Sequence, residues 1–268
     1  MPTIFQVGAG SGGMVVLDLL CREPSIRRIV LVEPDVYKSH NVHRHYFGHN
    51  DVGQRKADLA VRWLRQFRPD LEVTTLAVDL MDRERQPQIE TAVAGCDLGV
   101  CAVDVEPAKY HFDALMRKHQ KPWTLGEVLS GGIGGWVHVF RPGEACYGCV
   151  ASHLQRTIST DNSPSPDYAN PGAAVAETTV PASKAAVATI AGLHTTVTLG
   201  LLAGTDPGFT SWLLPLAKVD GVFAEALRPF RFRIPRSPEC LICGAQPGPA
   251  GEDLDVALDQ ALARLGHE

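Results

Sequence analysis

Four of the seven cysteines in this sequence stand in two closely spaced pairs, which suits them to bind a metal ion. Cys146 and Cys149 form one C-x-x-C pair, and Cys240 and Cys243 form the other. Two such pairs supply four thiolates, which a tetrahedral structural zinc requires, and a closed set of four leaves no position for water. We therefore expect one structural Zn²⁺ that joins the middle of the chain to its C-terminal part. Two redox-active dithiols, or buried thiols without a metal, are the alternatives.

A glycine-rich turn near the N-terminus has the spacing of a nucleotide-binding loop. Gly8, Gly10 and Gly13 match G-x-G-x-x-G, and Glu33 lies twenty residues beyond the last of them. Glycines at this spacing let phosphate groups approach the backbone at a helix N-terminus, and the acid can bind ribose hydroxyls. The motif alone fits a nicotinamide-dependent oxidoreductase as well as an ATP-binding protein.

Polar and basic residues gather shortly after Glu33, and they favour phosphoryl chemistry over hydride transfer. They are Asp35, Asn41, Arg44, Arg55 and Lys56. Cations can neutralise the charge that builds up on a polyphosphate as a bond to phosphorus breaks, whereas a dehydrogenase has no need of them here. Taken singly, Lys56 could be a solvated helix residue and Asn41 a turn residue. Asp104, a further candidate that follows the apolar run 98–102, could likewise be a cap at a strand end.

Four histidines in the same stretch raise the question of a second metal site. They are His40, His43, His45 and His49. Their irregular spacing matches no known ligand geometry, so we interpret them as loop residues beside an anionic nucleotide.

Short apolar runs that alternate with helical patterns must position these residues. We expect strands at 3–7, 29–32, 71–76, 98–102 and 135–140, and helices at 14–20 and 183–203. Alternating strands and helices indicate parallel βαβ units. The expected fold class is therefore α/β, with a Rossmann-like, mostly parallel sheet extended by C-terminal strands and a structural four-cysteine zinc site.

One domain is expected over residues 1–248, with a mobile loop at about 151–182 that is rich in Ser, Pro and Asn. Leucines at helical spacing predict an amphipathic helix over 249–268. That helix docks on the core or serves as a partner surface.

The overall composition is that of an ordinary globular chain. The sequence has 268 residues, of which 45% are hydrophobic, and a formal net charge of −5 at pH 7, which excludes a strongly basic nucleic-acid binder. The longest apolar runs, 29–32 and 199–203, fall short of the ~20 residues of a membrane span. The first residues read as a strand rather than a signal peptide. We expect a cytoplasmic protein with no nucleic-acid or membrane partner.

Taken together, these motifs give the sequence a specific likeness. From about residue 4 to residue 244 it resembles the ubiquitin-activating-enzyme superfamily, in particular its ThiF/MoeB branch. That family carries the glycine motif, an acidic stretch ending in Asn and Arg, a later Lys, an Asp after the fourth strand and two C-x-x-C pairs. The matching residues here are Gly8, Gly10, Gly13, Glu33, Asp35, Asn41, Arg44, Lys56, Asp104, Cys146, Cys149, Cys240 and Cys243.

The resemblance implies an ATP-dependent adenylyltransferase. It implies that Glu33 binds the ribose, that Asn41, Arg44 and Lys56 bind the phosphates, and that Asp104 lies near Mg²⁺. The implied substrate is a carboxyl terminus, above all the Gly-Gly end of a ubiquitin-like or sulfur-carrier protein, and the implied assembly is a homodimer. A C-terminal carboxylate has a pKa of about 3.3–3.7, so it is ionised at neutral pH and needs no general base. Catalysis then reduces to alignment and charge neutralisation, with Arg44, Lys56 and Asp104 as the expected catalytic residues.

The sequence departs from the family pattern at several positions. Glu33 replaces an Asp, Val105 follows Asp104 where Asn is typical, and Lys109 stands where Arg is common. An N-terminal segment whose Arg reaches the opposite subunit is not found. The segment 151–182 contains no cysteine, so we expect the reaction to stop at the acyl-adenylate. The alternatives are a non-catalytic ATP-binding scaffold subunit, or an enzyme that adenylylates a peptide or a small acid.

Overall fold

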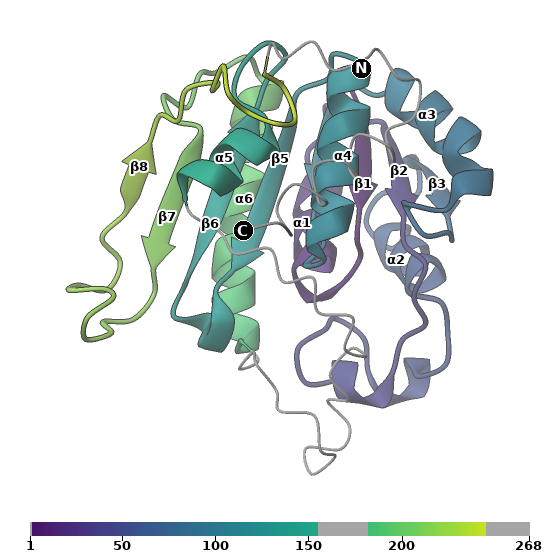
Figure 1. Cartoon of the computed structure of the whole chain (residues 1–268). Coiled ribbons are helices and arrows are strands. Elements are labelled where there is room, and N and C mark those ends of the chain that lie inside the picture. The colour runs from purple at the N-terminus through teal and green to yellow at the C-terminus, as the bar shows by residue number, and fades with distance from the viewer. Residues whose placement is uncertain (1, 155–181, 245–268) are drawn as a thin grey trace.

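Within the residues that the computed structural model describes, 2–154 and 182–244, eight strands form one mixed sheet (Figure 1). The strands lie in the order β3-β2-β1-β4-β5-β6-β7-β8. Their bounds are β1 (Thr3–Val7), β2 (Arg28–Val32), β3 (Glu72–Leu76), β4 (Leu98–Cys101), β5 (Trp123–Val128), β6 (Gly134–Phe140), β7 (Ser211–Pro215) and β8 (Phe230–Phe232). Strands β1 to β5 pair in parallel, and β6 to β8 continue the sheet in antiparallel pairs.

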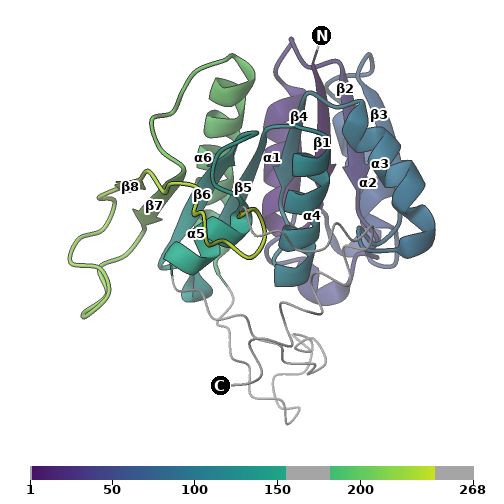
Figure 2. The same ribbon diagram turned by 45° about the horizontal axis from the view of Figure 1, so that its top comes forward.

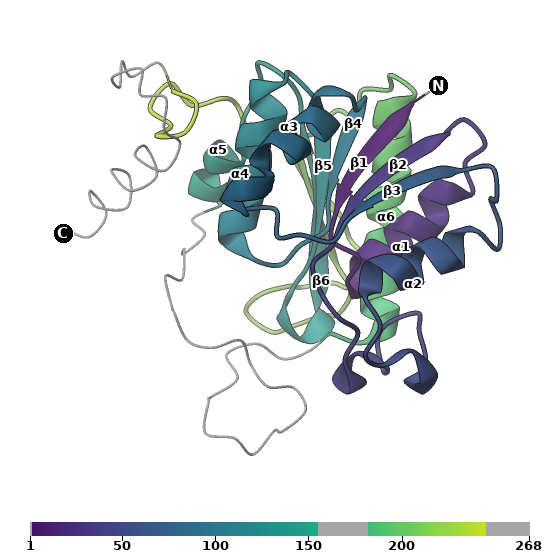
Figure 3. The same cartoon turned by 90° about the vertical axis from the view of Figure 1, so that its right-hand side faces the viewer.

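Helices cover both faces of this sheet. They are α1 (Ser11–Cys21), α2 (Lys56–Leu64), α3 (Gln86–Ala94), α4 (Glu106–Lys118), α5 (Tyr147–His153) and α6 (Lys184–Leu202). Figure 3 shows the sheet nearly edge-on, with α1, α2 and α6 on one side and α3, α4 and α5 on the other.

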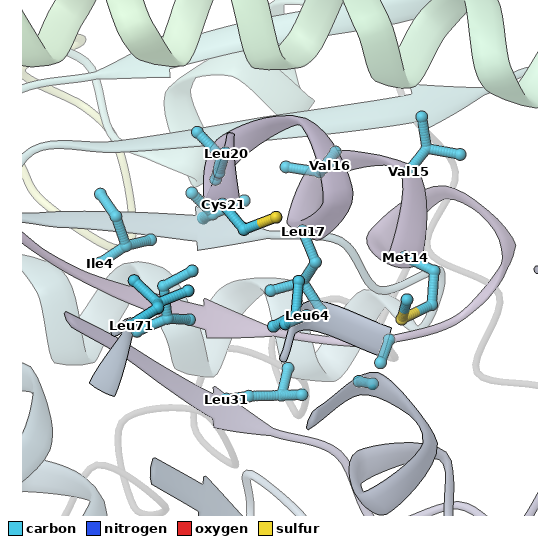
Figure 4. Close-up of a cluster of buried hydrophobic side chains, with 14 of the residues drawn as sticks. Ile4, Met14, Val15, Val16, Leu17, Leu20, Cys21, Leu31, Leu64 and Leu71 are labelled. Atoms are coloured by element: carbon cyan, nitrogen blue, oxygen red, sulfur yellow. The ribbon is translucent and has the colours of Figure 1, made fainter. Parts of the chain in front are cut away.

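The alternation of side chains along the central strands supplies one core for each face. On β1, Ile4 packs in the core under α1 and α2, and Phe5 packs in the opposite core under α4. On β2, Leu31 joins the first core and Val30 the second. Figure 4 shows the first core, where Leu17 and Leu64 meet the strands. Because these strands are buried on both faces, they read as continuous apolar runs in the sequence.

The predicted α/β class is confirmed, and the strands expected at 3–7, 29–32, 71–76, 98–102 and 135–140 are present to within one residue at each end. Strands β5, β7 and β8 were not predicted individually. The segment 151–153, expected to begin a loop, is the last part of α5. Most of the predicted loop at 151–182 and all of the predicted helix at 249–268 lie outside the described residues.

Helix α6 is the one described helix that is long and apolar enough to cross a membrane by composition alone, with a mean hydropathy of 1.6. It nevertheless belongs to the fold, because its buried residues pack with those of α1 and of β6. A core helix of this kind passes the same compositional test.

Candidate active site

Two of the three motif glycines are fixed by close packing, and the third is open. Gly8 has φ of +95°, and a Cβ there would lie 2.4 Å from the carbonyl oxygen of Ala102. A Cβ on Gly13 would lie 2.3 Å from the carbonyl oxygen of Gly8. A Cβ on Gly10 would meet nothing within 4 Å. The turn is therefore tight on its inner side, and its backbone is approachable at Gly10.

The open glycine stands at the N-terminus of α1. Gly10 is the N-cap residue, no side chain caps the helix, and its first turn holds no acidic residue. The first N–H groups of a helix lack partners within the helix, and its dipole favours negative charge at this end. This end of α1 can therefore receive an anionic group.

A buried glutamine forms hydrogen bonds with the backbone of the glycine turn. Gln6 is fully buried on β1, and its Nε2 donates to the carbonyl oxygens of Gly8 and Gly13, each at 2.9 Å. Sequence reasoning missed Gln6. A signal was present, because it is the one polar residue in the otherwise apolar run 4–7.

Glu33 lies at the end of β2 and holds the same turn. One of its oxygens accepts a hydrogen bond from the N–H of Ala9 at 2.5 Å, and the other accepts one from Asp35 N at 2.9 Å. Burial raises the pKa of the Glu33 carboxyl, although the charge of Lys56 and the two N–H donors oppose that shift. A carboxylate has about four acceptor positions, so hydroxyl groups of a ligand can still be bound.

Lys56 and Asp35 form an ion pair beside Glu33. The Nζ of Lys56 lies 2.6 Å from Oδ2 of Asp35, and the lysine N–H donates to the Asp35 carbonyl at 2.9 Å. The lysine is buried at the first residue of α2, whereas its partner is exposed. Lys56 is therefore not the solvated helix residue that one alternative expected.

Asn41 and Arg44 lie in the segment between β2 and α2. Asn41 is buried, and its Oδ1 accepts a hydrogen bond from Lys38 N at 2.9 Å, so this side chain shapes the turn. Arg44 is half-buried, and its N–H donates to the Asn41 carbonyl at 3.1 Å.

His45 stands among the basic groups of this segment. Burial, followed by the charges of four neighbours, lowers the pKa of His45 to about 3. In order of effect, the neighbours are Lys56, Arg44, Lys184 and His40. His45 is therefore neutral at neutral pH, and its Nδ1 is buried without a described hydrogen-bond partner.

Asp104 follows β4 and precedes α4, and it is exposed. Strand β4 lies beside β1, and Ala102 N donates to the Val7 carbonyl at 2.9 Å. Asp104 thus belongs to the same edge of the sheet as the glycine turn. Parallel α/β sheets bind ligands at this edge, where the strand order reverses, and here the reversal falls between β1 and β4.

Lys109 does not take part in this group of cations. It is buried, and its Nζ lies 2.6 Å from carboxylate oxygens of both Glu106 and Glu127. Glu127 also contacts Nε2 of His138 at 3.0 Å, and the Tyr147 hydroxyl donates to Glu106 at 2.7 Å. Burial alone would lower the pKa of Lys109, but the two carboxylates outweigh it and raise that pKa. Lys109 links α4 to β5.

The four paired cysteines come together as a cluster. Their sulfur atoms all lie within 4.8 Å of one another, and three of the separations are 3.4, 3.6 and 3.7 Å. Figure 2 shows the C-terminal segment that carries the second pair beside α5, which carries the first. A tetrahedral ion with bonds of about 2.3 Å to sulfur places its ligands about 3.8 Å apart. The cluster could therefore hold a metal ion.

The sequence between the ligands permits this approach. A Cβ on Gly148 would lie 2.7 Å from a side-chain atom of Ile242, and the N–H of Ser237 points to the Cys149 sulfur at 3.4 Å.

Burial raises the pKa of the other three cysteines to about 11 for Cys21 and about 12 for Cys96 and Cys101. Those three thiols are unsuited to nucleophilic chemistry.

Comparison with known proteins gives this arrangement its context. The model of the ThiF family matches residues 3–242. SAMP-activating enzyme E1 of Haloferax volcanii is 24% identical over 261 residues, which cover 97% of this chain and 87% of that protein. Ubiquitin-like modifier-activating enzyme 5 of Arabidopsis thaliana is 27% identical over 175 residues, or 58% of this chain. The match spans less than half of that protein, 40% of its length.

Solved structures share the fold. E. coli MccB has a TM-score of 0.68 at 15% identity, with 94% of this chain and 68% of MccB covered. The structure of MccB with ATP has a TM-score of 0.65 at 16% identity, with 91% and 67% covered.

Proposed function

The chain belongs to the ThiF family, and from this premise we propose that it uses ATP to adenylylate a carboxyl terminus, with release of pyrophosphate. The observation that carries the proposal is the meeting of three features at one edge of the sheet. These are the uncapped N-terminus of α1 at the open Gly10, the buried acid Glu33 and the buried cation Lys56.

Each feature matches one part of a nucleotide. The N-terminus of α1 suits a phosphate group, because its N–H donors and dipole face the open side of the turn. Glu33 retains acceptor capacity for ribose hydroxyls next to its two N–H contacts. Lys56 and Arg44 supply positive charge for the phosphates. Asp35 holds Lys56 in place, and Asn41 shapes the turn that carries Arg44.

Mg²⁺ is the expected companion of the nucleotide. Asp104 has an exposed carboxylate at this edge of the sheet, which suits a hard cation with oxygen ligands. When bound there, the ion supplies neutralisation of phosphate charge.

The proposed reaction needs little covalent help from the protein. An oxygen of the substrate carboxylate forms a bond to the α-phosphorus, and the bond from that phosphorus to the bridging oxygen of pyrophosphate breaks. The electron pair leaves with the pyrophosphate, and no proton has to move because the carboxylate is already ionised. Lys56 and Arg44 then stabilise the charge that develops on the leaving group. The product that remains is an acyl-adenylate.

The Gly-Gly end of a ubiquitin-like or sulfur-carrier protein is the substrate that we favour. Its support is the SAMP-activating enzyme, whose match extends over most of both chains. A peptide is the second candidate, since the neighbouring fold MccB has been crystallised with MccA. A homodimer and a Zn²⁺ held by the four clustered cysteines complete the proposal. Zinc suits a set of four sulfur donors at these separations.

Exchange of labelled pyrophosphate into ATP tests this function. The reaction is run with a ubiquitin-fold protein ending in Gly-Gly, with the same protein lacking both glycines, with short peptides and with small carboxylic acids. We expect exchange with the intact protein and none with the truncated one. ATP binding without exchange for any of these substrates would leave a scaffold subunit as the better description. Thermal stabilisation by NAD but not by ATP with Mg²⁺ would favour an oxidoreductase instead.

A further inference from the structure

Lys184 is a charged residue in a place where the sequence predicts only an apolar helix. It is the first residue of α6 and the one Lys, Arg, Asp or Glu in that helix. Helix α6 lies alongside α1 (Figure 3), and a Cβ on Gly12 would lie 3.7 Å from Cγ1 of Val187. Lys184 stands one helical turn before Val187, so it lies near the N-terminal end of α1.

The ammonium group of Lys184 has no hydrogen-bond acceptor among the described residues. Its Nζ is buried, and its described contact is the ring of Tyr46, with Nζ 4.3 Å from the ring centroid. A cation over an aromatic face is stabilised, but its three N–H donors still need acceptors. Burying an ammonium group without such acceptors is costly, so the arrangement calls for a compensating anion.

Lys184 shares a neighbour, His45, with other basic groups. The pKa of His45 is lowered by burial and then by the charges of Lys56, Arg44 and Lys184. His45 is next to Tyr46 in the chain. Burial is the resolved influence on the pKa of Lys184, and it lowers that pKa; among the described residues no carboxylate is resolved as opposing it. Asp18, which accepts a hydrogen bond from the Tyr46 hydroxyl at 3.5 Å, is also engaged with Arg22 and with the indole N–H of Trp63.

We infer that Lys184 binds phosphate oxygens of the nucleotide, as a third cation beside Lys56 and Arg44. This inference rests on the ATP site of the proposed function. Three cations gathered at the uncapped end of α1 suit a ligand with several negative charges, which an oligophosphate has and a single carboxylate does not. Inorganic pyrophosphate should therefore bind to the same group of residues.

Calorimetric binding measurements on the full chain test this assignment. The probes are inorganic pyrophosphate, ATP and adenosine, and the variants are Lys184→Met, Lys184→Arg and the control Lys218→Met, at a side chain that is 68% exposed. We expect Lys184→Met to weaken binding of pyrophosphate and ATP by about tenfold or more, the loss of one charge-assisted hydrogen bond. Adenosine binding should be unchanged, Lys184→Arg should restore part of the affinity, and Lys218→Met should bind like the wild type.

The Tm of the ligand-free protein is a second readout, because a structural role and a phosphate-binding role of Lys184 predict opposite changes. If Lys184 only stabilises the folded protein, its replacement should lower the Tm. Removal of a buried cation without described acceptors should leave the Tm equal or higher, because the methionine gives up only the contact with the Tyr46 ring and no longer buries a charge. We expect an equal or higher Tm in Lys184→Met, together with a smaller rise in Tm on addition of pyrophosphate.

Several outcomes would overturn the inference. Wild-type affinity for pyrophosphate and ATP in Lys184→Met would do so, as would an equal loss for all three probes together with a lower Tm. A wild-type protein that binds neither polyphosphate would remove both the inference and the ATP site. If polyphosphate binding depends on Lys184 but no carboxylate supports pyrophosphate exchange, the proposed function fails and the inference stands.

Discussion

Lys56 Nζ lies 2.6 Å from Oδ2 of Asp35, and the two side chains differ in exposure: the lysine is 9% exposed and the aspartate 60%. The fold therefore fixes the cation, while its anionic partner faces solvent. A ligand anion can therefore meet Lys56 beside the Asp35 carboxylate, which keeps the ammonium group in position.

Lys56→Met should abolish pyrophosphate exchange or reduce it by about 10²-fold or more, the effect of removing one donor that stabilises charge in the transition state. The matched control is Lys118→Met, at a lysine that is 60% exposed on α4, and it should exchange like the wild type. Gel filtration and circular dichroism should show that both variants fold. Unchanged exchange in Lys56→Met would remove this lysine from the reaction.

The local features of the site could be predicted from the sequence, and the contacts between distant segments could not. Spacing alone predicts the tight turn at Gly8 and Gly13 and the clustering of the two cysteine pairs. Gln6 and Lys184 do not, because their roles arise only when β1 meets the turn and α6 meets Tyr46. No local sequence pattern predicts contacts between segments that are so far apart in the chain.

The late strands show the same limit. Strand β8 carries Arg231, which stacks on Trp212 at 5.1 Å from the ring centroid, and β7 ends at Pro215. Strands that carry charged or proline residues lack the continuous apolar run by which β1 and β2 are recognised. Their place in the sheet is decided by pairing between distant segments, since β7 pairs with β6 and β8 pairs with β7.

Lys109→Met should destabilise the protein by about 3–5 kcal/mol, because it leaves two largely buried carboxylates without their cation. The side chains of Lys109 and Glu127 are 5% and 13% exposed. Lys118→Met on the same helix should cost about 0–1 kcal/mol, since that lysine pairs with Glu90 at the surface. Chemical denaturation measures both. The double variant Lys109→Met/Glu127→Gln should regain part of the loss, and a double variant no more stable than Lys109→Met would argue against this explanation.

His194 should make stability fall in mild acid. Burial lowers the pKa of His194 from 6.5 to about 4, so between those values the unfolded chain binds more protons than the folded one. Stability from this group is present above pH 6.5 and is lost as the pH falls toward 4, with a slope of up to about 1.4 kcal/mol per pH unit.

The comparison that isolates this effect is His194→Gln, which removes the titrating ring. Its unfolding free energy should depend less on pH over that window than the wild type's. His49→Gln, at an exposed position, should follow the wild type. The same pH dependence in wild type and His194→Gln would show that burial of this ring does not control it.

The protein as purified should contain one zinc ion per chain by elemental analysis. Cys240→Ser should lose the ion and lower the Tm sharply, because structural zinc contributes roughly 10–16 kcal/mol of apparent binding energy in small finger peptides. Cys96→Ser removes a buried thiol outside the cluster and should keep its zinc. Zinc retained at full stoichiometry in Cys240→Ser would contradict the four-cysteine site.

The proposed attack of a carboxylate on the α-phosphorus can be followed by the fate of its oxygen. A ubiquitin-fold protein whose terminal carboxylate is labelled with ¹⁸O is incubated with the enzyme, ATP, Mg²⁺ and hydroxylamine as acceptor, and the products are examined by mass spectrometry. The account predicts that one labelled oxygen appears in AMP. Label in inorganic phosphate, which attack on the γ-phosphorus would produce, or label that stays entirely in the carrier protein would contradict it.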